Sequence, residues 1–349
     1  IADKQRFVVL DGMRGLAAFA VITDHVRSPL MEGLFPGRYL AVDFFFVLSG
    51  FVLMHVYGRR LASNWSIGDF MRVRFIRFYP LYILGALAGA ALLALNAVKG
   101  WNAATLEHVA SSTVFAALFL PTPPPLSIWP NAPFPLNGPS WSLFFELFIN
   151  CVFAAIFTWL TPLRSALIAL AGAVGLLAFS LWSGELGGGY AWSNFPSGFG
   201  RVTLCFFAGV CIYQLRDRFR APVLPAWAGC ALLLAALMTP APGQFRLAFD
   251  LAASIVIFPF LVMTCADSRI GGPFASAAAW LGAVSYGVYV LHVPAWGWLQ
   301  LGLQYFGISI PGAAAVLAVA ALAAAAAWIL DKVYDAPLRR LLMRRRAPA

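Results

Sequence analysis

Residues 310–331 read IPGAAAVLAVAALAAAAAWILD, a stretch with one charged side chain, at its last position. A helix needs about 20 apolar residues to cross the hydrocarbon core of a bilayer, so this stretch predicts a membrane span. The small alanine side chains of 313–327 favour close packing against neighbouring helices.

The whole chain has the same apolar character. Of its 349 residues, 61% are hydrophobic and 11% are charged, and the mean hydropathy is +0.81. Soluble domains carry roughly 25% charged residues, so the composition excludes an ordinary soluble enzyme. We predict an all-α polytopic membrane protein with a single domain over residues 1–349 and about ten transmembrane helices. The expected spans are 8–26, 40–57, 78–97, 140–160, 165–183, 201–215, 223–239, 246–265, 280–300 and 310–331.

The apolar stretch 107–120 decides the orientation of the later spans. If this stretch does not cross, 18 of the 24 Lys and Arg residues fall on one side of the membrane; if it crosses, the division is nine against 14. Basic residues concentrate in cytoplasmic loops. We therefore expect 107–120 to be re-entrant or interfacial, both termini to be cytoplasmic, and the net charge of +10 to reflect this bias rather than nucleic-acid binding. Asp11 and Arg14 interrupt the first apolar run, which argues against a cleavable signal peptide.

Common cofactor motifs are missing from the sequence. It has no Gly-rich phosphate loop, no HExxH and no GxSxG. The five cysteines lie in apolar runs without metal-ligand spacing, so we expect no metal site and no disulfide framework. These cysteines are Cys151, Cys205, Cys211, Cys230 and Cys265.

Ionisable residues inside predicted spans are candidate functional groups, because charge is costly in a bilayer. Arg14 and His25 are 11 residues apart, which places them on one helix face about 16 Å apart along the axis. We expect both to line one water-filled channel, with Arg14 deep and His25 near the outer end. The alternative is that Arg14 snorkels inward while His25 is satisfied at the outer interface.

Two acidic residues lie near the predicted outer ends of their spans. Asp43 begins the second span, where a helix N-cap is the alternative role. Glu146 lies in PSWSLFFELFIN (139–150), six residues into the predicted span 140–160, where a carboxyl group should be protonated or have a cationic partner. Trp141 and Ser142 precede it, although a Trp at a helix end is ordinarily an interfacial anchor.

Arg72, Arg74 and Arg77 lie in RVRFIRFYPLY (72–82), at the predicted cytoplasmic edge of the third span. Three guanidinium groups there are suited to bidentate phosphate binding, and ordinary positive-inside charge explains them equally well. In the ninth span, Ser285, Tyr289 and His292 share one helix face. A structural hydrogen-bond network and substrate contact are both open for them.

Five of these stretches, in this order, resemble the membrane-bound acyltransferase family 3, which O-acylates bacterial surface glycans. They are LDGMRGLAAFAVITDH (10–25), AVDFFFVLSGF (41–51), RVRFIRFYPLY (72–82), WSLFFE (141–146) and SYGVYVLH (285–292). The resemblance implies a multi-pass protein of the bacterial inner membrane. It further implies an acyl group, expected to be acetyl, moving from cytoplasmic acyl-CoA to a glycan or glycolipid acceptor outside. Separate glycan-biosynthesis proteins are then expected partners.

The same resemblance implies roles for individual residues. His25 matches the catalytic histidine and Arg14 its motif partner, while Arg72, Arg74 and Arg77 match CoA-facing arginines. Glu146 matches an acidic position, although Leu147 stands where a second acidic residue is common. Trp141, Ser142, Tyr289 and His292 are candidate substrate contacts.

We expect His25 to act as general base on an acceptor hydroxyl, with Asp43 or Glu146 orienting its imidazole. Arg14 would steady polar atoms in the channel. An acyl-histidine intermediate is the alternative chemistry. A glycan or lipid transporter or flippase is the alternative function, although no internal repeat supports it.

Overall fold

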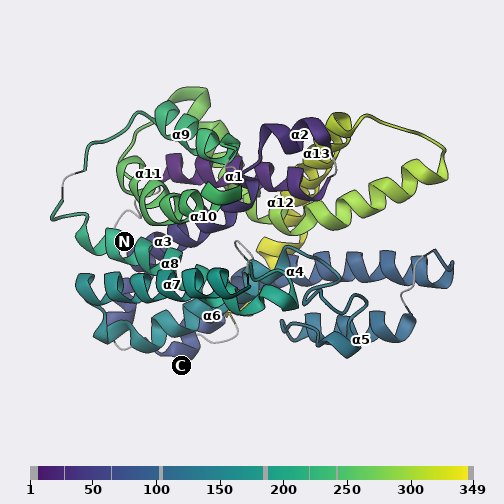
Figure 1. Cartoon of the computed structure of the whole chain (residues 1–349), viewed down its shortest axis with the longest axis horizontal. Coiled ribbons are helices and arrows are strands. Elements are labelled where there is room, and N and C mark those ends of the chain that lie inside the picture. Colours follow the sequence, from purple (N-terminus) through teal and green to yellow (C-terminus); the bar gives the residue numbers. More distant parts are fainter. Residues whose placement is uncertain are drawn as a thin grey trace.

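The computed structural model describes residues 7–26, 28–63, 65–101, 105–183, 188–219, 221–240 and 243–344. These residues form helices joined by turns and loops, with no strand among them (Figure 1), which confirms the all-α prediction. The helices are α1 (Val8–His25), α2 (Pro29–Leu34), α3 (Ala41–Ala62), α4 (Ile67–Val98), α5 (Leu106–Ala117), α6 (Ser140–Ile156), α7 (Pro162–Ser183), α8 (Phe195–Leu215), α9 (Ala226–Met238), α10 (Gly243–Ala252), α11 (Phe258–Cys265), α12 (Gly272–Tyr305), α13 (Gly312–Leu330) and α14 (Ala336–Arg344). Single π-helical turns join α10 to α11 and α13 to α14.

Eight helical segments in the described ranges are long and apolar enough to cross a membrane, and each corresponds to a predicted span. The other two predicted spans are α1 and α9. Helix α1 carries Asp11, Arg14 and Asp24, but it is packed among other helices and most of its residues are buried. Helix α9 has 13 residues, about 20 Å at 1.5 Å per residue, which is shorter than the bilayer core. Prolines at 225 and 240 bracket it and explain its length.

Close helix packing holds the bundle together. Helices α3 and α8 cross so tightly that a Cβ at Gly50 would lie 1.9 Å from the carbonyl oxygen of Phe206, and one at Gly209 would lie 2.0 Å from that of Val47. Only glycine allows this approach. Helices α1 and α12 run parallel and side by side, because residues near the start of one contact residues near the start of the other.

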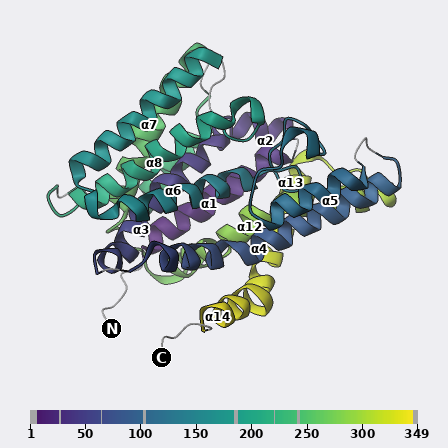
Figure 2. The ribbon, with the colours of Figure 1, turned by 90° about the horizontal axis from the view of Figure 1, so that it is seen from below.

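The segment predicted as re-entrant contains α5, whose 12 residues are too few for a crossing. It lies alongside α4, as Figure 2 shows. The hydroxyls of Tyr79 and Tyr82 donate to the carbonyls of Ala117 and Ala116, at 2.8 and 3.0 Å. The chain therefore turns back beside the middle of α4 before α6 begins at Ser140.

Helices α4, α8 and α12 begin six or more residues earlier than predicted. Helix α4 begins at Ile67 because Ser66 caps it, accepting a hydrogen bond from the Asp69 backbone at 3.0 Å. Helix α8 begins at Phe195, with a proline in its first turn. Consequently Arg72, Arg74 and Arg77 lie inside α4 rather than at its edge, and Arg201 lies inside α8.

Candidate active site

A cavity of about 180 Å³ lies between α1, α3, α4, α6 and α12. Most of its wall is apolar, formed by side chains such as Val42, Phe45, Phe46, Leu48 and Leu143. Three arginines and one carboxyl group also line it. They are Arg14, Arg74, Arg77 and Glu146.

Glu146 is nearly buried in this wall and has two polar partners. The hydroxyl of Ser49 on α3 donates a short hydrogen bond to its carboxylate, and the Arg74 guanidinium lies 3.4 Å away. Arg74 is therefore the cationic partner of Glu146, one of the two possibilities that the sequence left open. The guanidinium of Arg74 also stacks over the Phe78 ring at 4.8 Å.

This contact corrects the predicted depths. The sequence placed Arg74 at the inner edge and Glu146 in the outer half of the membrane. Because the two side chains are in contact, their charged groups lie at the same depth. Arg74 is seven residues after the start of α4, and Glu146 is six residues after the start of α6.

Arg14 anchors α1 to α12 beside the same cavity. Its Nε donates to Ser285 Oγ at 2.9 Å and its Nη2 to the Gly282 carbonyl at 2.8 Å. Asp11, one turn earlier, pairs with the same Nη2 at 2.9 Å. Ser285 is thus a structural partner of Arg14 and also lines the cavity.

The remaining two arginines of α4 differ from each other. Arg77 lines the cavity and stacks over the Tyr286 ring at 5.1 Å. Arg72 does not line it; its Nη2 donates to the Leu342 carbonyl of α14 at 2.6 Å. The structure therefore brings Arg74 and Arg77 to the cavity, whereas the side chain of Arg72 points along a different face of α4.

His25 contacts His292 rather than a carboxylate. Nδ1 of His25 lies 3.1 Å from Nε2 of His292, and the two rings pack edge to face at 4.8 Å. His292 is fully buried, and its Nδ1 lies 3.1 Å from the Val288 carbonyl oxygen. The expectation that Asp43 or Glu146 orients His25 is contradicted by these partners.

The cavity stops short of the histidines. Neither His25 nor His292 lines it, so the expected open channel from the arginines to His25 is interrupted. Tyr289 separates them: its ring lines the cavity, packs edge-on against Phe45 at 5.7 Å and lies 6.2 Å from the His292 ring. The Tyr289 hydroxyl is fixed to Ser142 on α6 by a 2.7 Å hydrogen bond.

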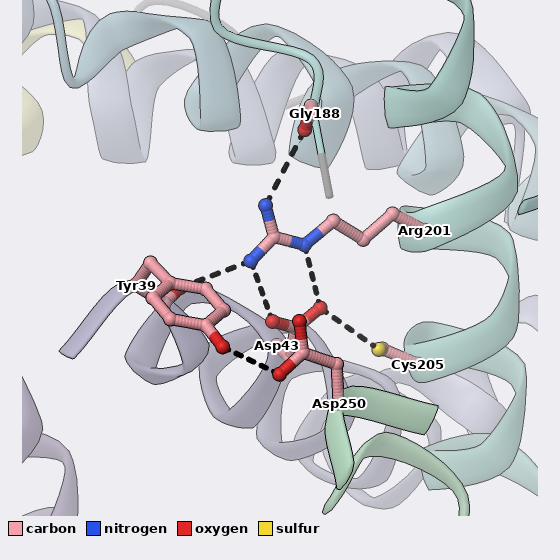
Figure 3. Close-up of polar contacts among 6 residues, drawn as sticks. All are labelled: Tyr39, Asp43, Gly188, Arg201, Cys205 and Asp250. Atoms are coloured by element: carbon pink, nitrogen blue, oxygen red, sulfur yellow. Dashed lines mark hydrogen bonds and ion pairs between the residues drawn. The ribbon is translucent and has the colours of Figure 1, made fainter. Parts of the chain in front are cut away.

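Asp43 belongs to a separate buried cluster (Figure 3). Arg201 clamps its carboxylate with two hydrogen bonds of 2.7 and 2.6 Å, and Cys205 approaches the same carboxylate at 3.5 Å. The Arg201 guanidinium also donates to the carbonyls of Tyr39 and Gly188, at 2.9 and 3.3 Å. This cluster joins α3 to α8, and it directs both oxygens of the Asp43 carboxylate toward Arg201.

Comparison with known proteins identifies the family. A family model described as an acyltransferase domain matches residues 7–332. The chain belongs to this acyltransferase family. The exopolysaccharide production protein ExoZ of Rhizobium meliloti is 30% identical over 325 residues, covering 88% of this chain and 92% of its own. Protein 2 in the picA locus of Rhizobium radiobacter is 37% identical over 186 residues, covering 50% of this chain and 95% of its own. No solved structure matches the chain.

The chain is thus a multi-pass membrane acyltransferase, and the residues around its cavity suit an anionic ligand. The cavity wall carries three guanidinium groups and the Glu146 carboxyl group, and Asp11 beside Arg14 adds a second carboxyl group. Guanidinium groups therefore outnumber carboxyl groups by one. Nε of Arg74 is buried without a hydrogen-bond partner among the described residues, so it has capacity for a ligand. At about 180 Å³ the cavity is smaller than the ~300–1,000 Å³ of ordinary ligand sites, so it must widen to admit a ligand of ordinary size.

Trp141 has a structural position in the acyltransferase. It is 9% exposed, does not line the cavity, and packs over the Arg201 guanidinium at 5.4 Å. The sequence analysis missed the role of Arg201 because it placed that residue at the outer end of the predicted span 201–215. The proline at 196, a strong helix-start signal, would have placed it one and a half turns inside α8. Asp250, whose carboxylate accepts a hydrogen bond from the Tyr39 hydroxyl, had no sequence signal.

Proposed function

We propose that this acyltransferase moves an acyl group, acetyl in the simplest case, from cytoplasmic acyl-CoA to a hydroxyl of an exported glycan. Family membership supports the reaction class, and the relative named for exopolysaccharide production supports a polysaccharide acceptor. The observation that carries the proposal is the apolar cavity with a surplus of guanidinium groups, which ends one aromatic side chain away from a histidine pair.

The residues that line the cavity then bind and orient the acyl-CoA donor. Arg74 and Arg77 bind the phosphates of CoA, with Arg14 as a third cation further along the cavity. The apolar wall of Val42, Phe45 and neighbouring side chains guides the acyl-bearing arm toward Tyr289. Transfer requires the Tyr289–Phe45 contact to open, because this pair separates the cavity from His25.

His25 acts at the acceptor. It removes the proton of the acceptor hydroxyl as the oxygen attacks the thioester carbonyl carbon, a role suited to a neutral imidazole. The new C–O ester bond forms, the C–S bond breaks, and the proton passes to the departing CoA sulfur. The products are the acylated glycan and free CoA. The acceptor reaches His25 from the extracytoplasmic side, with both termini of the chain in the cytoplasm of a bacterial inner membrane.

The test is release of free CoA from acetyl-CoA by the purified protein in lipid nanodiscs, with a surface oligosaccharide as acceptor. General base catalysis typically contributes 10²–10⁴-fold, so His25→Ala should lower kcat by at least about 100-fold. His108→Ala is the matched control, because the imidazole of that histidine is bonded to Thr105 at the start of α5, away from the cavity. Near-normal CoA release by a folded His25→Ala protein would contradict the role of His25. Glycan movement without CoA release would instead indicate the transporter alternative.

A further inference from the structure

The partners of His292 fix the position of its proton. Its side chain is fully buried, and its Nδ1 faces the Val288 carbonyl oxygen at 3.1 Å. A carbonyl oxygen only accepts hydrogen bonds, so Nδ1 must carry the proton. Among the residues that the structure describes, no carboxylate contacts the ring, and an unpaired charge in such a place is costly, so the ring is neutral. Nε2 of His292 is then an acceptor.

The same logic extends to His25. Its Nδ1 lies 3.1 Å from Nε2 of His292 and 3.3 Å from the Val21 carbonyl oxygen. Both neighbours are acceptors, so Nδ1 of His25 carries the proton and donates to them. The other ring nitrogen, Nε2, holds the lone pair and has no partner among the residues that the structure describes.

We propose that His292 is a positioning residue that holds His25 in the tautomer with a free Nε2, ready to accept a proton. The catalytic meaning of this arrangement depends on the proposed acyl transfer, whereas the proton arrangement itself does not. Acidic residues often orient catalytic histidines, but the nearest one in sequence is engaged elsewhere: Asp24 pairs with Arg38 at 2.8 Å. A neutral imidazole therefore occupies the place that a carboxylate takes in Ser-His-Asp triads.

The buried hydrogen-bond relay ends at a backbone carbonyl. Val288 is four residues before His292 on α12, so the helix itself orients the His292 ring. Because α1 and α12 are parallel and closely packed, the two histidines are held at one level by the same contacts that hold the helices together.

The first test reads the tautomers directly, without donor or acceptor. The chain has only four histidines, so ¹⁵N-labelled histidine rings in nanodiscs can be assigned with single variants. We expect His25 to be neutral with its proton on Nδ1. His292→Gln places an amide oxygen near the former Nε2 and should preserve this tautomer, whereas the shorter His292→Asn should not. A proton on Nε2 of His25 in the unmodified protein would overturn the proposal.

The second test is kinetic. In the Ser-His-Asp triad a wrongly set tautomer lowers kcat by about 10⁴. Because a neutral partner contributes less than a carboxylate, we expect His292→Asn to lower kcat by at least about tenfold, with KM for acetyl-CoA unchanged and His292→Gln restoring most of the loss. His55→Gln is the control, since His55 is bonded to Tyr213 in another part of the bundle.

The outcomes separate this inference from the proposed function. Equal kcat values for His292→Asn and His292→Gln, or a His25 tautomer unchanged in His292→Asn, would overturn the positioning role. Absence of CoA release from every protein, the unmodified one included, would refute the acyl transfer, while the labelled rings would still decide the proton arrangement.

Discussion

The Asp43–Arg201 pair allows a quantitative test of what holds α3 against α8. Both side chains are almost completely buried, with 3% and 6% of their surfaces exposed, and two charge-assisted hydrogen bonds join them. In Asp43→Leu, the guanidinium keeps only the carbonyls of Tyr39 and Gly188 as acceptors. Removing one partner of a buried ion pair typically costs about 3–5 kcal/mol, so we expect a loss of this size in the free energy of unfolding.

Arg201→Met should cost a similar amount, because it leaves the Asp43 carboxylate with the Cys205 thiol as its remaining described partner. The double variant removes both charges and should be destabilised by much less than the sum, with a coupling on the order of 3 kcal/mol. The assay is equilibrium unfolding of all four proteins in mixed micelles of one composition. Additive losses would refute the reasoning that each charge is buried only because of the other.

The pair also distinguishes a structural Asp43 from a catalytic one. If its role is to hold the helices, the folded double variant should release CoA within about tenfold of the normal rate, a barrier change below ~1.4 kcal/mol. A double variant that regains stability but does not release CoA would indicate that Asp43 has a catalytic role.

Two further predictions concern the helix crossing and the arginines. Gly50→Ala should destabilise the protein by at least about 1–3 kcal/mol in the same unfolding assay, because its Cβ would overlap the Phe206 carbonyl; Gly175→Ala, with open space at its Cβ, is the control and should not. Arg74→Lys should raise KM for acetyl-CoA about tenfold, or ~1.4 kcal/mol of binding, because lysine lacks the planar fork. Arg72→Lys should leave that KM unchanged, since Arg72 does not line the cavity; equal effects of the two changes would contradict the cavity assignment.

Apolar runs predicted most of the fold, because a membrane span is specified by length and composition over about 20 residues. The prediction was least accurate at helix ends, where Ser66 and the proline at 196 add turns whose residues are not especially apolar. The added turns of α4 carry Arg72, Arg74 and Arg77, and those of α8 put Arg201 inside the helix rather than at its end. An error in a helix boundary thus became an error in the depth of Arg74 and in the place of Arg201.

The candidate site shows a different limit. Helical periodicity correctly grouped Arg14 with His25 on one face and Ser285 with His292 on another, because such relations are local. The contact between the His25 face of α1 and the His292 face of α12 depends on how the two helices pack. This packing is set by small residues spread along both helices. Sequence reasoning therefore assigned His25 a carboxylate partner, whereas the structure gives it His292.

Helix α12 has 34 residues and α4 has 32, so each is about 50 Å long at 1.5 Å per residue. The hydrocarbon layer is only about 30 Å thick, and even with both headgroup regions a bilayer measures about 40–45 Å. Unless they tilt strongly, these helices extend past the lipid headgroups. Under the proposed function, an acceptor polymer that approaches the side where these helix ends stand would meet rigid protein before it meets the lipid.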